Sequence, residues 1–142
     1  MIKNIQTFCQ EIGESACYAL SIIHIAELVT GKYYNILELL NAGIMRKYIR
    51  YNANDPNDDN NFFVDYPAEF LSMIIARPVS MKKVDGEIYY PRKNEYVIDR
   101  WERKRTGCTT GHFRMADWDS LFDSQTVKYG KIVSHRVFTV GE

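Results

Sequence analysis

Cys17 opens an apolar run and is the residue best suited to covalent chemistry. The segment from Ser15 to about Val29 has the apolar spacing of a buried helix, and Ser15 or Glu14 can cap it. A thiol in the first turn of a helix faces unpaired N–H groups and the positive end of the dipole, which favour the thiolate. Cys17 is therefore a candidate nucleophile for attack on a carbonyl carbon. The alternative interpretation is that Cys17 is a small apolar residue of the core.

Three histidines compete for the role of base beside Cys17. His24 lies on the same expected helix, roughly 10 Å along its axis, which is too far for a direct hydrogen bond. His135 alternates with its neighbours in a strand-like segment, where a structural role is the favoured interpretation. His112 follows a Thr-Thr-Gly sequence and opens a strand, so its ring can project from a strand end towards a helix N-terminus. His112 is therefore the candidate base.

Asp119 is the candidate that orients the imidazole of His112. If residues 116–117 close a two-residue hairpin, Asp119 lies on the same sheet face as His112, diagonally across, and a small shift of register places it directly opposite. A carboxylate there would stabilise the charged form of the ring. Asp117 is the rival, although an aspartate in a turn usually bonds its own backbone.

Gln10 is the candidate for stabilising an oxyanion. It lies just upstream of Cys17, and its side-chain amide could donate a hydrogen bond together with the backbone N–H of Cys17. The residues expected to carry the chemistry are thus Cys17, His112, Asp119 and Gln10.

The elements that must position these residues begin with helices. Thr30-Gly31 should end the helix that starts near Cys17. Further helical segments are expected at residues 35–40, 44–49 and 67–75. Asn41-Ala42-Gly43 should break the second helix, and Asp65 should cap the last, with Pro67 in its first turn. Residues 52–61 form an Asn/Asp/Pro run typical of an exposed loop.

The second half of the chain is expected to be mainly strands. The strand-like segments are 79–84, 87–90, 112–115, 118–121 and 132–140. Asp85-Gly86 suggests a hairpin turn between the first two. Residues 95–104 have apolar residues at helical spacing and are predicted to form a helix. The order predicts an α+β fold, with N-terminal helices packed on a C-terminal antiparallel sheet.

Length and composition restrict the class of protein. A chain of 142 residues matches a single domain, spanning 1–142, and 46% hydrophobic residues suffice for a core. Eighteen basic residues balance eighteen acidic ones, so no general attraction to nucleic acid or to a membrane surface is expected. Three cysteines without a secretory leader favour free thiols and a cytoplasmic location.

Two parts of the chain carry a family resemblance. They are the run Gln10-x-x-Gly13-x-Ser15-Ala16-Cys17 before an apolar helix, and Gly111-His112-Phe113 followed by Trp118-Asp119. These motifs resemble the papain-like cysteine peptidases in their small form, such as the peptidase domains of bacteriocin-processing transporters. The stretch 119–138 is similar to an uncharacterised group of small spirochaete and phage proteins. Residues 30–80 match only loosely.

The resemblance implies a papain-like fold and a Cys-His-Asp catalytic triad. Cys17, His112 and Asp119 would act as nucleophile, base and orienting residue, and Gln10 would help to form the oxyanion hole. We therefore expect a cysteine hydrolase that cleaves a peptide or amide bond in a peptide or protein substrate, without a cofactor. The alternative is a catalytically silent interaction module on a papain-like scaffold, related to phages or mobile elements.

A metal site is the weaker interpretation of the cysteines. Cys108 and His112 have the spacing of helical ligands, and Cys9 and Cys17 could complete a set of four. The sequence has no Cys-x-x-Cys unit, and the Thr- and Gly-rich surroundings of Cys108 do not favour a helix. No metal ligand and no cofactor-binding residue is therefore expected.

Overall fold

The computed structural model describes residues 16–51, 62–105, 108–115 and 130–142, with only the backbone of residues 103–105 and 108–112. Its helices are α2 (Cys17–Thr30), α3 (Ile36–Met45) and α4 (Pro67–Ile75). Its strands are β1 (Ile49–Tyr51), β2 (Phe62–Val64), β3 (Val79–Asp85), β4 (Glu95–Arg105), β5 (Cys108–Arg114) and β6 (Lys131–Val140). Helices dominate the first half and antiparallel strands the second, which confirms the predicted α+β class.

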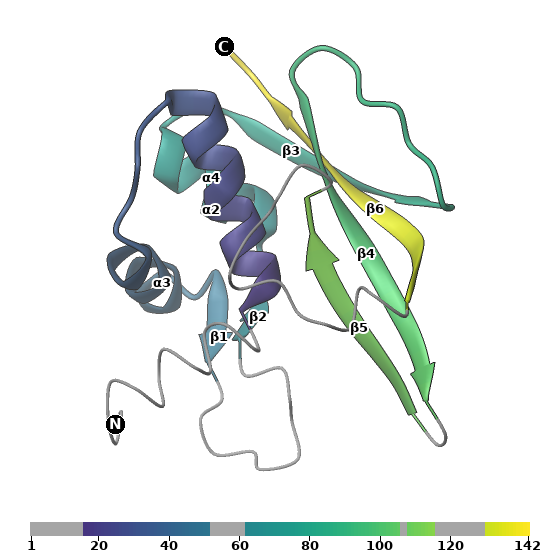
Figure 1. The fold of residues 1–142 in the computed structure, drawn as a ribbon. Coiled ribbons are helices and arrows are strands. Elements are labelled where there is room, and N and C mark those ends of the chain that lie inside the picture. Colours follow the sequence, from purple (N-terminus) through teal and green to yellow (C-terminus); the bar gives the residue numbers. More distant parts are fainter. Residues whose placement is uncertain (1–15, 52–61, 106–107, 116–129) are drawn as a thin grey trace.

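The main sheet has four antiparallel strands in the order β3-β6-β4-β5. Helices α2 and α4 lie against one face of this sheet, while α3 lies farther out, next to β1 (Figure 1). The short antiparallel pair of β1 and β2 lies near the N-terminal end of α2. Because β5 is an edge strand, its outward N–H groups have no strand partner within the sheet.

Helix α2 is the centre of the core. Its buried side chains pack with Phe70 and Leu71 of α4 and with Ile98 and Phe138 of the sheet, all of which are fully shielded from solvent. Such burial is the main favourable term in folding. It also fixes the first turn of α2, and hence Cys17, relative to the sheet.

The prediction for α2 is confirmed at its C-terminal end and wrong at its N-terminal end. Gly31 ends the helix in the left-handed conformation, with φ 69°, as Thr30-Gly31 suggested. At the start, the N-cap is Ala16 rather than Ser15 or Glu14, and no side chain caps the helix there. Since a methyl group cannot accept a hydrogen bond, Ala16 leaves the N–H groups of the first turn available.

The predicted break at residues 41–43 is wrong, because α3 continues through it to Met45. Gly43 is needed for close packing rather than for a turn. A Cβ at this position would lie 2.7 Å from Ile49 Cδ1 and 2.9 Å from Phe70 Cε1. Residues 44–49 accordingly hold the end of α3 and the start of β1 instead of a separate short helix.

Asp65 does not cap α4 as predicted. The N-cap is Tyr66, which makes no side-chain cap, while Pro67 occupies the first turn as expected. The carboxylate of Asp65 instead accepts two hydrogen bonds from the guanidinium of Arg50, at 2.6 and 3.0 Å. This bidentate ion pair links β1 to the loop that precedes α4.

The predicted helix over 95–104 is wrong, because these residues form most of β4. Alternation explains the error: Tyr96 and Ile98 pack towards the core, while Asp99 faces the other side of the sheet. The apolar residues in this window suit both a helix and a strand, and pairing with β5 and β6 decides between them.

The hairpin predicted at Asp85-Gly86 is also wrong. Residues 87–90 are not a strand, and β3 pairs with β6 at the end of the chain. Gly86 has φ 122° and donates its N–H to Val133 O, so it ends the β3–β6 ladder. The predicted loop 52–61 and strand 118–121 lie outside the described residues.

Among the residues described, no helix combines the length and apolar character that a membrane span requires.

Candidate active site

Cys17 lies where the first turn of α2 meets the edge strand β5. Its Sγ accepts a hydrogen bond from the backbone N–H of Phe113 at 3.5 Å, across 96 residues of sequence. The side chain is partly exposed. The fold therefore brings an early thiol against the strand that contains the predicted base.

The backbone of His112 is directly adjacent to this contact. His112 precedes Phe113 in β5 and pairs with Trp101 of β4. Its side chain is outside the described part of the structure, as are Gln10, Asp117 and Asp119. Of the four predicted site residues, the structure thus places Cys17 against β5, the edge strand that contains His112, in which His112 and Phe113 occupy alternate sheet faces.

The electrostatics of Cys17 combine opposing influences. Burial raises the pKa of its thiol, while the Phe113 N–H and the positive charge of Arg100 lower it. The N–H groups of Tyr18 and Cys17 in the first turn also lower this pKa. Burial dominates, so with the described neighbours alone the group favours the neutral thiol.

Phe113 contacts the thiol through its backbone N–H and two arginines through its ring. On one side it stacks on Tyr18, with ring centroids 4.2 Å apart and an interplanar angle of 14°. The guanidinium carbons of Arg100 and Arg136 lie 4.7 and 5.3 Å from its centroid. Arg100 pairs with Phe113 across the β4–β5 ladder, so strand pairing determines this arrangement.

A groove of about 500 Å³ lies beside these residues. Its lining consists of Lys83, Asp85, Arg100, Glu102, Phe113, Val133, Ser134 and Arg136. Strands β3, β4, β5 and β6 all contribute, on the sheet face that also receives α2. The groove therefore adjoins the thiol through Phe113.

Comparison with protein families identifies the chain at the level of a family. A family model described as "Protein of unknown function, DUF261" matches residues 1–140. The chain belongs to the DUF261 family. No curated protein and no solved structure matches it significantly.

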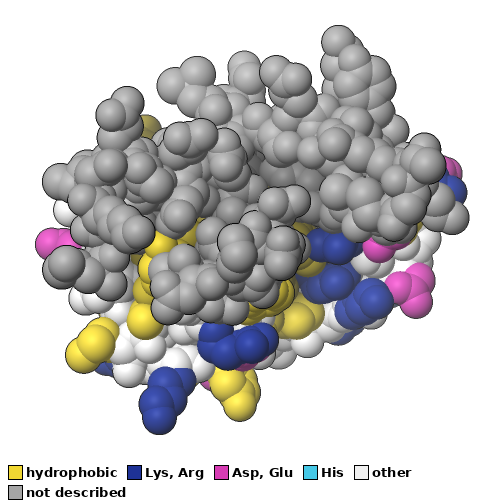
Figure 2. Space-filling view, turned by 90° about the horizontal axis from the view of Figure 1, so that it is seen from below, with side chains coloured by type: hydrophobic (Ala, Val, Ile, Leu, Met, Phe, Trp, Pro, Cys, Tyr) yellow, Lys and Arg dark blue, Asp and Glu magenta, His cyan; other side chains and the backbone are white. Residues whose placement is uncertain are grey.

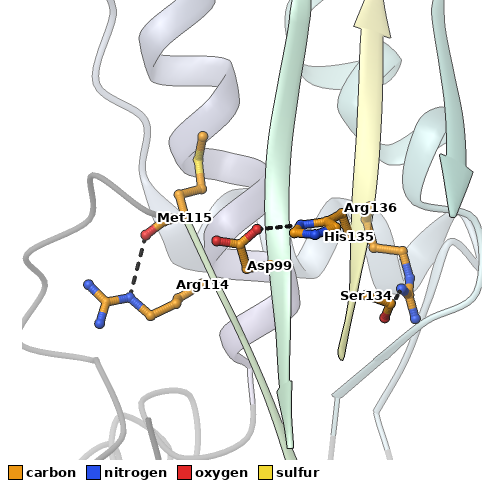
Figure 3. A network of polar contacts seen from close by, with 6 residues as sticks. All are labelled: Asp99, Arg114, Met115, Ser134, His135 and Arg136. Atoms are coloured by element: carbon orange, nitrogen blue, oxygen red, sulfur yellow. Dashed lines mark hydrogen bonds and ion pairs between the residues drawn. The ribbon is translucent and has the colours of Figure 1, made fainter. Parts of the chain in front are cut away.

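The opposite sheet face of this DUF261 chain holds a buried pair that the sequence analysis missed. His135 Nδ1 lies 2.7 Å from Asp99 Oδ1, and both residues are buried (Figure 3). Figure 3 also shows Arg136 directed away from this pair, towards Ser134. Strand alternation over 95–105 would have predicted Asp99 on this face, but the segment was interpreted as a helix.

His135 is separated from Cys17 by the thickness of the sheet, because its neighbours Ser134 and Arg136 line the groove on the α2 face. Its Nε2 is buried and has no hydrogen-bond partner among the described residues. The pair fixes the position of β4 relative to β6. His135 is thus not placed to act as the base for Cys17.

Metal binding finds no support in the described side chains. They contain no group of three or more His, Cys, Asp or Glu residues close enough together to hold an ion. Cys9 and the side chain of Cys108, which the zinc interpretation needs, lie outside that part of the chain.

Proposed function

We propose that this chain is a cysteine hydrolase with a papain-like fold, in which Cys17 is the nucleophile and His112 the base. One observation carries the proposal: the Cys17 thiol contacts the backbone of Phe113, the residue next to His112. A helix N-terminus that presents a thiol to an antiparallel sheet is the arrangement expected from the resemblance to papain-like peptidases.

The proposed reaction uses the thiol of Cys17, the imidazole of His112 and backbone N–H groups of the first turn of α2. Cys17 Sγ attacks the carbonyl carbon, His112 accepts the thiol proton, and the carbonyl oxygen becomes an oxyanion. The backbone N–H of Cys17 is available to bind that oxyanion, with Gln10 as the proposed second donor. Collapse breaks the C–N bond, His112 protonates the leaving amine, and water then hydrolyses the thioester. Asp119 is the proposed partner that orients His112.

The proposal gives His112 a specific electrostatic role. Because burial raises the pKa of the Cys17 thiol, the nucleophile needs a nearby cation to become a thiolate near neutral pH. Arg100 acts in that direction, but burial outweighs it. An imidazolium at His112 is the remaining charge that we expect to complete the activation.

The proposed setting follows from the same chemistry. A nucleophilic thiol must stay reduced, so we place the protein in the cytoplasm, with a peptide or protein as substrate.

The second candidate function is an interaction module without catalysis. The observation that favours it is the burial that raises the pKa of Cys17, because a binding module has no need to activate this thiol. The two functions predict different reactivities for the same atom.

Iodoacetamide labelling of the folded protein at pH 7 tests the proposal. If the proposal is correct, Cys17 is alkylated at least roughly tenfold faster than Cys9 or Cys108, as measured by mass spectrometry of the three peptides. The His112→Ala variant should lose this advantage and retain the fold by circular dichroism. Equal rates at all three cysteines in the wild-type chain would support the binding module and reject the nucleophile.

A further inference from the structure

The groove next to Cys17 contains two arginines that have no carboxylate partner within the described part of the chain. Neither Arg100 nor Arg136 lies within ion-pair distance of an acidic side chain in the described regions. Arg136 donates to Ser134 Oγ at 3.0 Å, and both guanidiniums contact the Phe113 ring. Most of their hydrogen-bond donors are therefore left for a ligand.

The two arginines are held close together against their mutual repulsion. Burial lowers the pKa of the Arg136 guanidinium, and the charge of Arg100 lowers it further, while Asp85 acts in the opposite direction. Arg136 pairs with Ile98, and Arg100 lies two residues farther along β4 on the same sheet face, so the sheet fixes their separation. An anion between them would relieve this repulsion.

The other charged groups of the groove limit the charge of that anion. Lys83 and Asp85 lie 3.7 Å apart and largely compensate each other at the exposed edge. Glu102 is the remaining acidic residue in the lining. The lining thus has an excess of one positive charge, which suits a singly charged carboxylate better than a doubly charged phosphate.

The groove also lies on the sheet face that carries the ring of Phe113, the residue whose backbone contacts the thiol. Phe113 lines the groove and donates its N–H to Cys17 Sγ, and the charge of Arg100 is felt at that sulfur. Figure 2 shows Lys and Arg side chains gathered beside hydrophobic ones on the face seen from below. A group bound at the two arginines would therefore be part of the molecule that Cys17 attacks.

We propose that Arg100 and Arg136 form a subsite that binds a carboxylate of the peptide substrate next to Cys17. This inference rests on the proposed hydrolase function and adds its substrate class: peptides with an acidic group close to the bond that is cleaved. Two sources share this chemistry, an Asp or Glu side chain and the carboxylate of a free peptide C-terminus.

The test compares two small alkylating reagents at Cys17, iodoacetate and iodoacetamide. In both reactions the thiolate forms an S–C bond and iodide leaves, so they differ mainly in the carboxylate of iodoacetate. The ratio of the two rates cancels any change in the fraction of thiolate. It therefore separates binding of an anion from activation of the sulfur.

We expect Arg100→Gln and Arg136→Gln each to lower the ratio of iodoacetate to iodoacetamide rates by roughly threefold to tenfold. Arg100→Lys should retain most of the preference because it retains the charge. Arg92→Gln is the matched control: Arg92 is exposed in the loop before β4, and its loss should leave the ratio unchanged. Circular dichroism checks folding, and either arginine variant alone suffices for the test.

The outcomes test the hydrolase function and the carboxylate subsite separately. Slow alkylation of Cys17 by both reagents rejects the hydrolase, and with it the subsite. Fast alkylation by iodoacetamide with the same ratio in wild type, Arg100→Gln and Arg136→Gln keeps the hydrolase and overturns the subsite. Fast alkylation with a ratio that falls in the arginine variants supports both.

Short peptides then identify the source of the carboxylate through protection of Cys17 from iodoacetamide. The peptides are acetyl-Gly-Glu-Gly-amide, acetyl-Gly-Gln-Gly with a free carboxylate, and acetyl-Gly-Gln-Gly-amide. Protection by the first or the second, lost in Arg136→Gln, supports the subsite and assigns its carboxylate. Equal protection by all three peptides contradicts it.

Discussion

The two faces of the main sheet place polar side chains in opposite situations. On one face, Asp99 and His135 are buried, with Nδ1 and Oδ1 2.7 Å apart, so each supplies a hydrogen-bond partner to the other. On the face that receives α2, Arg100 and Arg136 are only partly buried and have no acidic partner among the described residues. The same strands, β4 and β6, supply all four residues.

This difference separates a structural role from a functional one. A buried polar pair with a short hydrogen bond stabilises one arrangement of the strands and is closed to ligands. Unpaired cations beside a groove and a thiol cost stability and are open to a ligand. A histidine beside an aspartate is therefore not sufficient to identify an active site, and its position relative to the nucleophile decides.

Substitution of Cys17 should have the largest effect on function. Cys17→Ala removes the nucleophile, so we expect complete loss of hydrolysis of an acidic peptide library, measured by mass spectrometry. The partly exposed side chain is small, and the free energy of unfolding should change by less than about 1 kcal/mol. Activity equal to that of the wild type would show that the chemistry lies elsewhere.

Substitution of Asp99 should lower stability and leave the reactivity of Cys17 unchanged. Asp99→Ala leaves the buried His135 Nδ1 without its partner, so the free energy of unfolding should fall by about 1–3 kcal/mol in urea denaturation. At urea concentrations below the unfolding transition, the rate of Cys17 alkylation should stay at the wild-type value. Glu87→Ala, at an exposed position, is the control and should change neither quantity. A large loss of Cys17 reactivity in folded Asp99→Ala would contradict this separation and show that the Asp99–His135 pair contributes to the site of Cys17.

The pH dependence of Cys17 alkylation tests whether His112 belongs to the site of Cys17. Without the imidazolium, burial keeps the pKa of the thiol above its usual range, so in His112→Ala the rate should rise only at a pH above that at which an exposed cysteine ionises. In the wild type the rise should occur at lower pH, with a rate at pH 7 that is roughly tenfold higher. Identical profiles in the two proteins would remove His112 from the site.

Local patterns predicted the elements that depend on neighbouring residues. The apolar run after Cys17 with Gly31 at its end, Pro67 in the first turn of α4, and the alternation of β6 were all confirmed. The errors occurred where distant partners decide. Residues 95–105 have apolar side chains compatible with both periods, and only pairing with β5 and β6 makes them a strand.

In the candidate site, too, some features follow from local sequence and others from distant pairing. The sequence itself determined that Cys17 stands at a helix N-terminus, because helix periodicity is a local property, although the predicted cap at Ser15 or Glu14 was wrong. It could not determine that Arg100, Phe113 and Arg136 share a groove beside that thiol, since a helix over 95–104 would have placed Arg100 elsewhere. Only the antiparallel pairing of three strands brings these residues together, because register is set by packing across the whole sheet.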